Sequence, residues 1–122
     1  MPKATSQIDR RLIGTWRSDG RRTLKEYSFP EDSTDKDRRR IRRYFGDLIL
    51  RYTARRIYSR LRDRKGITPY TVIAMDSESV AILYWDSLLE EHRIQHIHFE
   101  GDRFWISLGD RNREFFRRVH ED

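Results

Sequence analysis

The chain has 122 residues, no cysteine and a formal net charge of +6, with 38% charged and 36% hydrophobic residues. The lack of cysteine excludes disulfides, thiolate metal sites and cysteine nucleophiles, and an aromatic content of 12% argues against a disordered chain. We expect one domain over 1–122, and because no stretch has the apolar length of a signal peptide or a membrane span, the sequence predicts a cytoplasmic protein.

The first strand is predicted around Gly14-Thr15-Trp16, after a lead-in over residues 1–11. Gly14 and Trp16 share one face of an extended segment. The glycine there leaves room for a close crossing, and the tryptophan buries a large surface. Asp19-Gly20 is a signal for a hairpin turn, and residues 23–29 are the expected return strand.

A helix is predicted over residues 33–46, with hydroxyl caps at Ser33 and Thr34 and a stop at Gly46. Its surface is rich in arginine, whose guanidinium group binds phosphates with two parallel hydrogen bonds. The alternative is a solvated helix face on which acidic neighbours balance the charge. The candidates for anion binding are Arg38, Arg39, Arg42 and Arg43.

After Gly46 the chain predicts closely spaced strands, which must pair antiparallel because their connections are too short for crossover helices. With the first strand they make eight, or nine if the Asp19-Gly20 hairpin forms. The fold class is therefore an all-β, eight- to nine-stranded up-and-down barrel with one helix between the first and second long strands. The predicted strands are Asp47–Thr53, Arg56–Arg62, Ile67–Asp76, Ser79–Asp86, Glu91–Glu100, Arg103–Leu108 and Arg113–Val119.

Gly14-Thr15-Trp16 resembles the G-x-W motif in the first strand of the calycin superfamily, which includes lipocalins, fatty-acid-binding proteins and avidins. In lipocalins an arginine of the last strand packs over this tryptophan. Arg117 is the candidate, because Phe115 and Val119 on its face are apolar, and Arg118 is the second choice. The chain lacks the lipocalin T-D-Y motif and the C-terminal R-x-Y of fatty-acid-binding proteins, so the resemblance covers the architecture and two anchor positions.

The resemblance implies a lipocalin-like domain with a ligand in the barrel interior. We predict a non-enzymatic protein that binds a small, partly apolar molecule, with rim arginines receiving an anionic head group. The alternative is a nucleic-acid or polyanion-binding module that uses the arginine-rich helix. Each candidate for lining the pocket could equally be a core or surface aromatic. These candidates are Tyr52, Tyr70, Tyr84 and Trp105.

His92, His96 and His98 share one face of a predicted strand. His-x-His spacing suits a metal ion, which makes His96 and His98 the candidate ligands, with Asp86 or a neighbouring glutamate as a third. The alternative is that these side chains face solvent or hydrogen-bond within a polar interior. We predict neither a metal nor a cofactor.

Strands Ile67–Asp76 and Ser79–Asp86 are apolar on both faces. A strand with one buried face should alternate, so something is expected to cover the outside of this hairpin. A second copy of the chain is the simplest cover, which predicts a homodimer. The alternatives are the N-terminal segment and the arginine-rich helix.

Motifs for catalysis are lacking: the sequence has no nucleophile elbow, P-loop, H-E-x-x-H or G-x-G-x-x-G. Glu90 and Glu91 are neighbours and point to opposite sides of an extended segment, so they cannot act as a carboxylate pair. The sequence therefore favours binding over catalysis.

Overall fold

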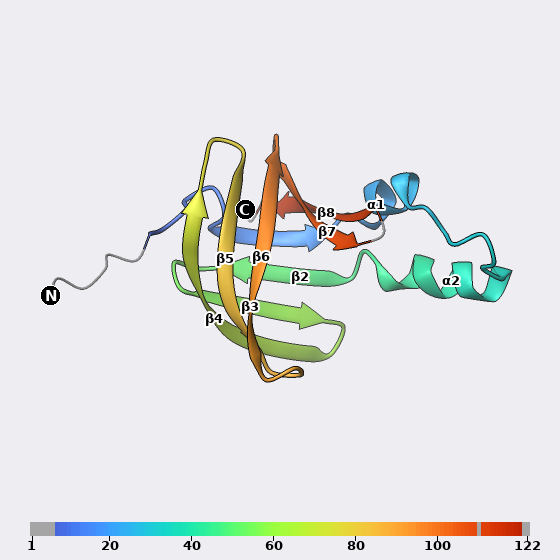
Figure 1. Cartoon of the computed structure of the whole chain (residues 1–122), viewed down its shortest axis with the longest axis horizontal. Coiled ribbons are helices and arrows are strands. Elements are labelled where there is room, and N and C mark those ends of the chain that lie inside the picture. Colours follow the sequence, from blue (N-terminus) through green and yellow to red (C-terminus); the bar gives the residue numbers. More distant parts are fainter. Residues whose placement is uncertain (1–6, 110, 121–122) are drawn as a thin grey trace, which may run out of the picture.

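The computed structural model describes residues 7–109 and 111–120. Its main feature is a closed barrel of eight antiparallel strands that pair in chain order, with β1 and β8 completing the ring (Figure 1). The predicted antiparallel barrel is confirmed, with eight strands rather than nine. The strands are β1 (Gly14–Ser18), β2 (Leu48–Tyr52), β3 (Arg56–Leu61), β4 (Arg64–Met75), β5 (Ser79–Asp86), β6 (Glu91–Glu100), β7 (Arg103–Gly109) and β8 (Asn112–Val119).

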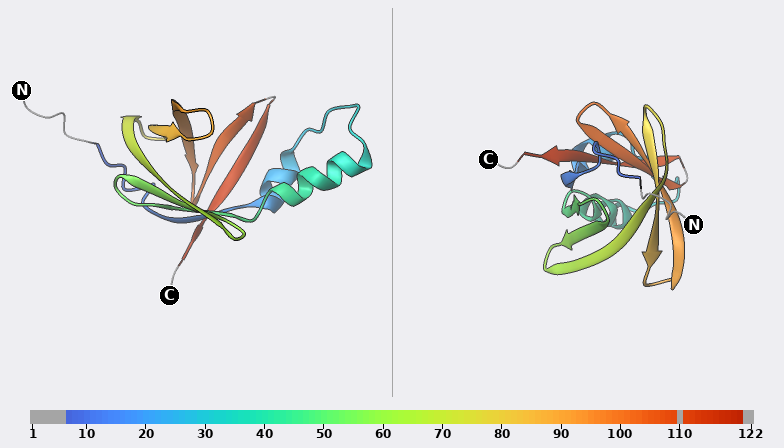
Figure 2. Two further views of the ribbon diagram at one scale, coloured as in Figure 1. Left: turned by 90° about the horizontal axis from the view of Figure 1, so that it is seen from below. Right: turned by 90° about the vertical axis from the view of Figure 1, so that its left-hand side faces the viewer.

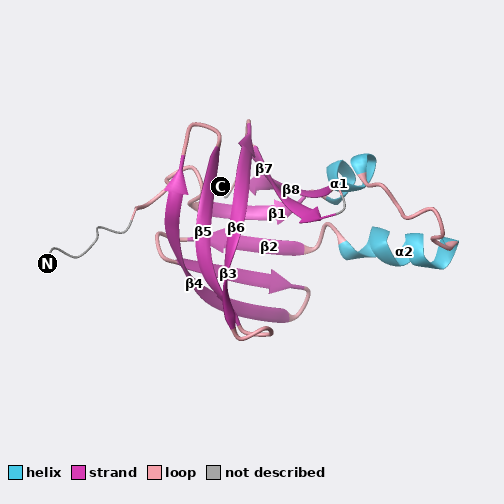
Figure 3. Ribbon diagram, viewed as in Figure 1, coloured by secondary structure: helices cyan, strands magenta, loops and turns pink. Residues whose placement is uncertain are grey.

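The segment after β1 forms a helix, α1 (Gly20–Glu26), and not the return strand of a hairpin (Figure 3). The Asp19 side chain accepts a hydrogen bond from the Arg22 backbone N–H at 3.1 Å and so caps this helix. Thr23 is fully buried, and its Oγ1 accepts from the Phe115 N–H of β8 at 2.9 Å. The hairpin prediction is wrong because Asp-Gly suits both a turn and a helix start, and packing on β8 selects the helix.

The predicted helix over 33–46 is confirmed as α2 (Asp35–Tyr44). Thr34 and Asp37 form a reciprocal capping box, in which each side chain accepts from the other residue's backbone N–H at 3.1 and 3.3 Å. None of the helix residues is buried, and α2 projects away from the barrel (Figure 2). No helix in residues 7–109 and 111–120 has the length and apolar character needed to cross a membrane.

The lead-in reaches the barrel through an ion pair in which the acid is buried and the arginine is partly exposed. Asp9 is 3% exposed, and Arg11 donates to both of its carboxylate oxygens at 2.9 and 2.6 Å. The Arg11 guanidinium also donates to the carbonyl of Ser77 at 3.0 Å, in the β4–β5 turn. Residues 1–6 of the predicted lead-in lie outside the described residues.

One end of the barrel is filled by large side chains from nearly every strand. Trp16 is 1% exposed and makes an edge contact with Phe104, whose ring stacks on Phe116. The Trp16 indole N–H donates to the carbonyl of Leu12 at 2.8 Å, so its polar atom is satisfied inside the core. The other core members of this packed end are Leu12, Tyr52, Tyr70, Val72, Val80, Ile82 and Ile97.

Strand bounds agree closely with the sequence except at β4. β5 and β6 have the predicted bounds, whereas β4 begins at Arg64, three residues before the predicted Ile67. The chain reverses within Arg62 and Asp63, and Arg62 adopts a positive φ of 58°. Gly66, which precedes the predicted strand, lies inside β4 opposite Ser59.

Candidate functional site

The packed end of the barrel is closed by Arg118 and not by Arg117. The Arg118 guanidinium lies 4.2 Å from the centre of the Trp16 ring and donates to the carbonyl of Ile13 at 2.9 Å. Gly14 makes this position accessible, because a Cβ there would lie 2.5 Å from Arg118 Nη1. The sequence correctly predicted that an arginine of the last strand covers the tryptophan of the first strand. Of the two adjacent arginines, it selected the wrong one.

The choice of Arg117 is wrong because the apolar face that carries it is not the interior. Phe115 is fully buried, but it lies outside the barrel, beneath Arg22 and Thr23 of α1. Arg118 pairs directly with Trp16 in the β1–β8 register and therefore shares its inward face. Because α1 was not predicted, the sequence did not show that Phe115 is buried on the outer face of β8 and that the alternate residues face the core.

The predicted pocket residues separate into three environments. Tyr52 and Tyr70 are each 5% exposed and pack edge-on against one another within the closed end. Tyr84 faces the interior and is half-buried. Trp105 is an incorrect prediction: it lies on the outer face, stacked on His98 at 4.0 Å and covered by Arg113.

Burial changes the acidity of the two enclosed tyrosines. It raises the pKa of Tyr70 to about 12, and it raises the pKa of Tyr52 still further above the ordinary value. The Tyr70 hydroxyl donates to the carbonyl of Thr53 in the β2–β3 connection. Both rings therefore act as neutral core aromatics at the closed end.

The half of the interior nearer the helices has a wall that is only half-buried. Its apolar members pack against the core and are partly exposed to solvent. A small amphipathic molecule can cover an apolar surface of this kind and remove it from solvent. Leu48, Leu50 and Ile106 belong to this wall, whereas Ile57 and Tyr84 are half-buried residues that lie opposite Tyr52 and Tyr70.

A buried carboxyl group lies at this end of the interior. Glu114 is 7% exposed and shares the inward face of β8 with Phe116. Ser18 Oγ donates to Glu114 Oε2 at 2.7 Å and accepts from the Gly46 N–H at 3.1 Å. Burial raises the pKa of the Glu114 carboxyl, and the Ser18 hydrogen bond opposes this shift in part. Glu114 was missed from sequence because nothing local distinguishes it from a surface acid.

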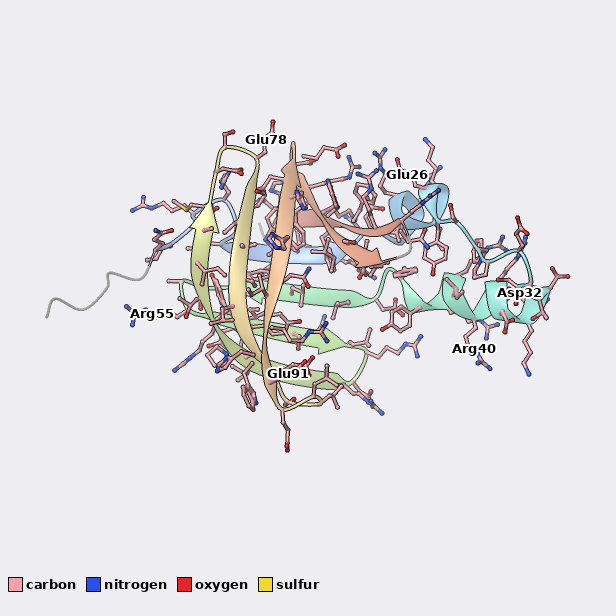
Figure 4. All side chains as sticks on the ribbon, in the orientation of Figure 1. Glu26, Asp32, Arg40, Arg55, Glu78 and Glu91 are labelled. Carbon is pink, nitrogen blue, oxygen red and sulfur yellow. The ribbon has the colours of Figure 1, made fainter. Side chains whose placement is uncertain are left out.

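The arginines of α2 divide between two sides of the helix. Arg38 and Arg42 lie over the Phe29 ring at 5.4 and 5.8 Å. Arg39 and Arg43 face a different surface, and the side chain of Arg40, labelled in Figure 4, extends from α2 away from the barrel. A hollow of about 420 Å³ is lined by Lys36, Arg39, Arg40, Arg43, Tyr44 and Arg62.

A second basic hollow, of about 470 Å³, lies on the outer face of strands β1 to β4. No contiguous motif marks it, because its residues come from several strands and alternate with inward-facing ones. Its lining includes Arg17, Arg51, Tyr58, Arg60 and Lys65.

The three histidines share the outer face of β6, as their spacing predicts. His92 makes an edge contact with Trp85, and His98 stacks on Trp105. Across the part of the chain that the structure describes, no three His, Asp or Glu side chains gather closely enough to hold a metal ion.

The outer face of β4, β5 and β6 carries exposed apolar side chains. Ile73, Trp85 and Ile94 are 44%, 42% and 56% exposed. Of the covers expected from sequence, α2 projects away from these strands (Figure 1), and Gln7 makes a single bridge to Val72. The homodimer stays a prediction, which light scattering at high protein concentration tests.

Comparison of the chain with protein-family models, curated proteins and solved structures finds no match.

Proposed function

We propose that this protein is a non-enzymatic, calycin-like binding protein that holds a small, partly apolar molecule at the helix end of the barrel interior. The observation that carries the proposal is the Ser18–Glu114 pair, a buried carboxyl beside a half-buried apolar wall. A carboxyl group in such a place costs folding free energy unless its oxygens are hydrogen-bonded, and Ser18 donates to one of them, Oε2. A ligand that brings a hydrogen-bond donor would bond the other oxygen.

The calycin-like assignment is supported by the relation between the first and last strands. Trp16 follows Gly14 by two residues, and an arginine of the last strand covers its ring. This end is filled by core side chains, so the bound molecule belongs at the opposite end. Arg93, an exposed residue opposite Tyr84 across β5 and β6, is on the same face and forms an ion pair with Asp86 at 3.8 Å.

The test uses 1-anilinonaphthalene-8-sulfonate, an amphipathic molecule whose fluorescence rises in apolar sites. Ile106→Trp fills the interior beside Glu114, the residue next to Ile106 on the neighbouring strand. Ile94→Trp adds the same bulk on the outer face of β6, where Ile94 is 56% exposed. We expect Ile106→Trp to weaken probe binding at least tenfold, a loss of about 1.4 kcal/mol, and Ile94→Trp to leave it unchanged.

A second measurement concerns the carboxyl group. Decylamine should compete with the probe better than decanoate does, and Glu114→Gln should remove that preference. Equal probe binding by the two tryptophan variants would refute the interior site. Identical circular dichroism spectra of the variants establish that the barrel is intact.

A second candidate function is polyanion binding by α2. The hollow lined by Lys36, Arg39, Arg40, Arg43 and Arg62 contains five basic residues and no acid. Arg43→Glu should weaken binding of fluorescent heparin at low salt. Arg42→Glu is the matched control, because it makes the same charge change on the side of α2 that covers Phe29. Equal effects of the two substitutions would contradict a site in this hollow.

A further inference from the structure

Strand register brings basic residues from five strands into one row across the outside of the barrel. Arg17 of β1 lies opposite Arg117 of β8, and Arg60 of β3 lies opposite Lys65 of β4. The row runs from β7 to β4, and the sixth strand in it, β2, contributes Ile49. Its members, in spatial order, are Arg103, Arg117, Arg17, Ile49, Arg60 and Lys65.

A second row runs beside the first and is apolar and aromatic apart from one threonine and one arginine. The Arg51 guanidinium lies 4.1 Å from the centre of the Tyr58 ring, which places a cation and an aromatic ring side by side on this surface. Ile67, at the end of this row, is 65% exposed. The members are Val119, Thr15, Arg51, Tyr58 and Ile67.

The two rows carry no acidic residue, and most of their cations have no partner of opposite charge. Arg103 is paired with Asp19 at 3.2 Å. The other four cations of the basic row form no ion pair with any carboxylate in the described residues, although Arg17 Nε donates to the carbonyl of Gly46 at 3.0 Å. These four are Arg17, Arg60, Lys65 and Arg117.

This arrangement costs folding free energy. Like charges directly opposite one another on neighbouring strands repel, and the row contains three such pairs: Arg103 with Arg117, Arg117 with Arg17, and Arg60 with Lys65. A polyanion laid along the row would turn this repulsion into attraction. The cost therefore points to an anionic partner that spans several strands.

We propose that a single strand of nucleic acid lies across β8, β1, β2, β3 and β4 on the outside of the barrel, with phosphates on the basic row and bases over the Arg51–Tyr58 pair. Neighbouring strands are spaced by about 4.8 Å, so these five strands carry the proposed path over about 19 Å of the barrel surface. Guanidinium planes and aromatic rings both stack on bases, whatever the base.

The shape of this surface favours a polymer over a lipid bilayer. Four members of the basic row, all except Arg103 and Arg117, and all five of the second row line the hollow of about 470 Å³. Most of them belong to β1, β2, β3 and β4, which lie side by side in Figure 1. A flexible strand can enter a hollow, whereas a flat bilayer reaches only its edges. The proposal is independent of the ligand site inside the barrel, because side chains of the two surfaces alternate along each strand.

Arg60→Glu tests the proposal with two readouts that move in opposite directions. The carboxylate introduced at position 60 faces Lys65, so the repulsive pair becomes an ion pair and thermal stability should rise. Binding of a fluorescent oligouridylate of about eight nucleotides should fall at least tenfold, because one phosphate contact is lost and a repulsion is added. If Arg60 had only a structural role, its substitution would not raise thermal stability while lowering oligouridylate affinity.

Salt dependence measures the number of contacts. Four unpaired cations predict a slope of about −2.8 for log affinity against log salt, which is about a fifty-fold loss between 50 and 200 mM. In Arg60→Glu the slope should shrink to about −2. A wild-type slope near zero would overturn the proposal.

Control substitutions test where the nucleic acid binds and whether its bases contribute to binding. Arg42→Glu makes the same charge change on the side of α2 that covers Phe29, outside both the basic row and the α2 hollow, and should leave oligouridylate affinity within about twofold. Arg51→Lys keeps the charge but removes the plane that stacks on bases, so it should weaken oligouridylate at least about fivefold and heparin hardly at all. Equal losses from Arg42→Glu and Arg60→Glu, or binding to phosphatidylserine vesicles without binding to oligouridylate, would overturn the proposal.

Discussion

The Arg118 guanidinium covers the Trp16 ring at 4.2 Å and donates to the carbonyls of Ile13 and Arg11 at 2.9 and 2.6 Å. These contacts join the last strand, the first strand and the lead-in. A partly desolvated cation–π contact contributes about 1 kcal/mol, and a hydrogen bond to a charged group about 1.5 kcal/mol or more. We expect Arg118→Ala to lower the free energy of unfolding by about 2–3 kcal/mol, as measured by urea denaturation.

Arg117→Ala is the matched control. Arg117 is exposed and lies between Arg17 and Arg103 in the strand register. Its removal should change the free energy of unfolding by less than about 0.5 kcal/mol, in the stabilising direction because two repulsive neighbours lose a partner. Similar losses from both alanine variants would show that the contact with Trp16 is not what holds this end together.

Gly14 is predicted to tolerate no side chain. Its φ is +132°, and a Cβ would lie 2.5 Å from Arg118 Nη1, so Gly14→Ala brings both backbone strain and a clash. We expect a loss of about 2–4 kcal/mol in the free energy of unfolding. Gly101→Ala, at φ +63° with nothing within 4 Å of the added Cβ, should cost only about 1 kcal/mol.

A double-mutant cycle separates the two components at Gly14. In the Arg118→Ala background the clash is absent and only the backbone strain remains, so Gly14→Ala should cost at least about 0.5 kcal/mol less there than in the wild type. Strict additivity of the two substitutions would contradict the close approach of Arg118 to Gly14.

Thr23 is expected to hold α1 against β8 through its hydroxyl group. Thr23 is fully buried, and its Oγ1 accepts from the Phe115 N–H at 2.9 Å. Thr23→Val keeps the shape but leaves a buried N–H without an acceptor, which should cost about 1–3 kcal/mol in chemical denaturation. Thr23→Ser keeps the acceptor and should lose only about 1 kcal/mol, for the missing methyl group. A larger loss from serine than from valine would contradict this role.

Glu114 is predicted to make stability depend on pH. Burial raises its carboxyl pKa above the ordinary 4.5, so the folded protein keeps a proton that the unfolded chain releases as pH rises. The contribution of Glu114 to stability is therefore complete below 4.5 and is lost as pH rises from there to the folded-state pKa.

The comparison variant for this titration is Glu114→Gln, which keeps an acceptor for Ser18 but does not ionise. Its melting temperature should rise relative to that of the wild type as pH increases between about 4 and 7. Glu31→Gln, a change at an exposed acid, should give no such trend. Parallel melting curves for Glu114→Gln and the wild type across this range would contradict the shift.

Local sequence signals predicted most of the fold. Alternating apolar residues and short polar turns located the strands after Gly46, with the bounds of β5 and β6 matching to the residue. Thr34 could also be predicted as a cap of α2, because its capping hydrogen bonds involve only residues within one helical turn. α1 was missed because its apolar partner, Phe115, is far away in the chain.

The candidate sites were harder to predict, because each depends on which face of a strand points inward. Successive residues of a strand point to opposite faces, so Arg118 faces the interior while the adjacent Arg117 faces outward. For the same reason Trp105 lies outside the barrel. Glu114 reads as an ordinary acid until β1 places Ser18 against it. The local sequence pattern reveals neither which strand face points inward nor the contact between Ser18 and Glu114.

Local sequence patterns specify an antiparallel barrel with Gly14 and Trp16 in its first strand, because period-two patterning and turn residues act over a few positions. Contacts between distant strands specify that Arg118 closes one end, that Glu114 is buried, and that Arg17, Arg60, Lys65 and Arg117 align in one row. The difference arises from register, because hydrogen bonding between distant strands sets which residues lie opposite one another, and charge and burial follow from that pairing.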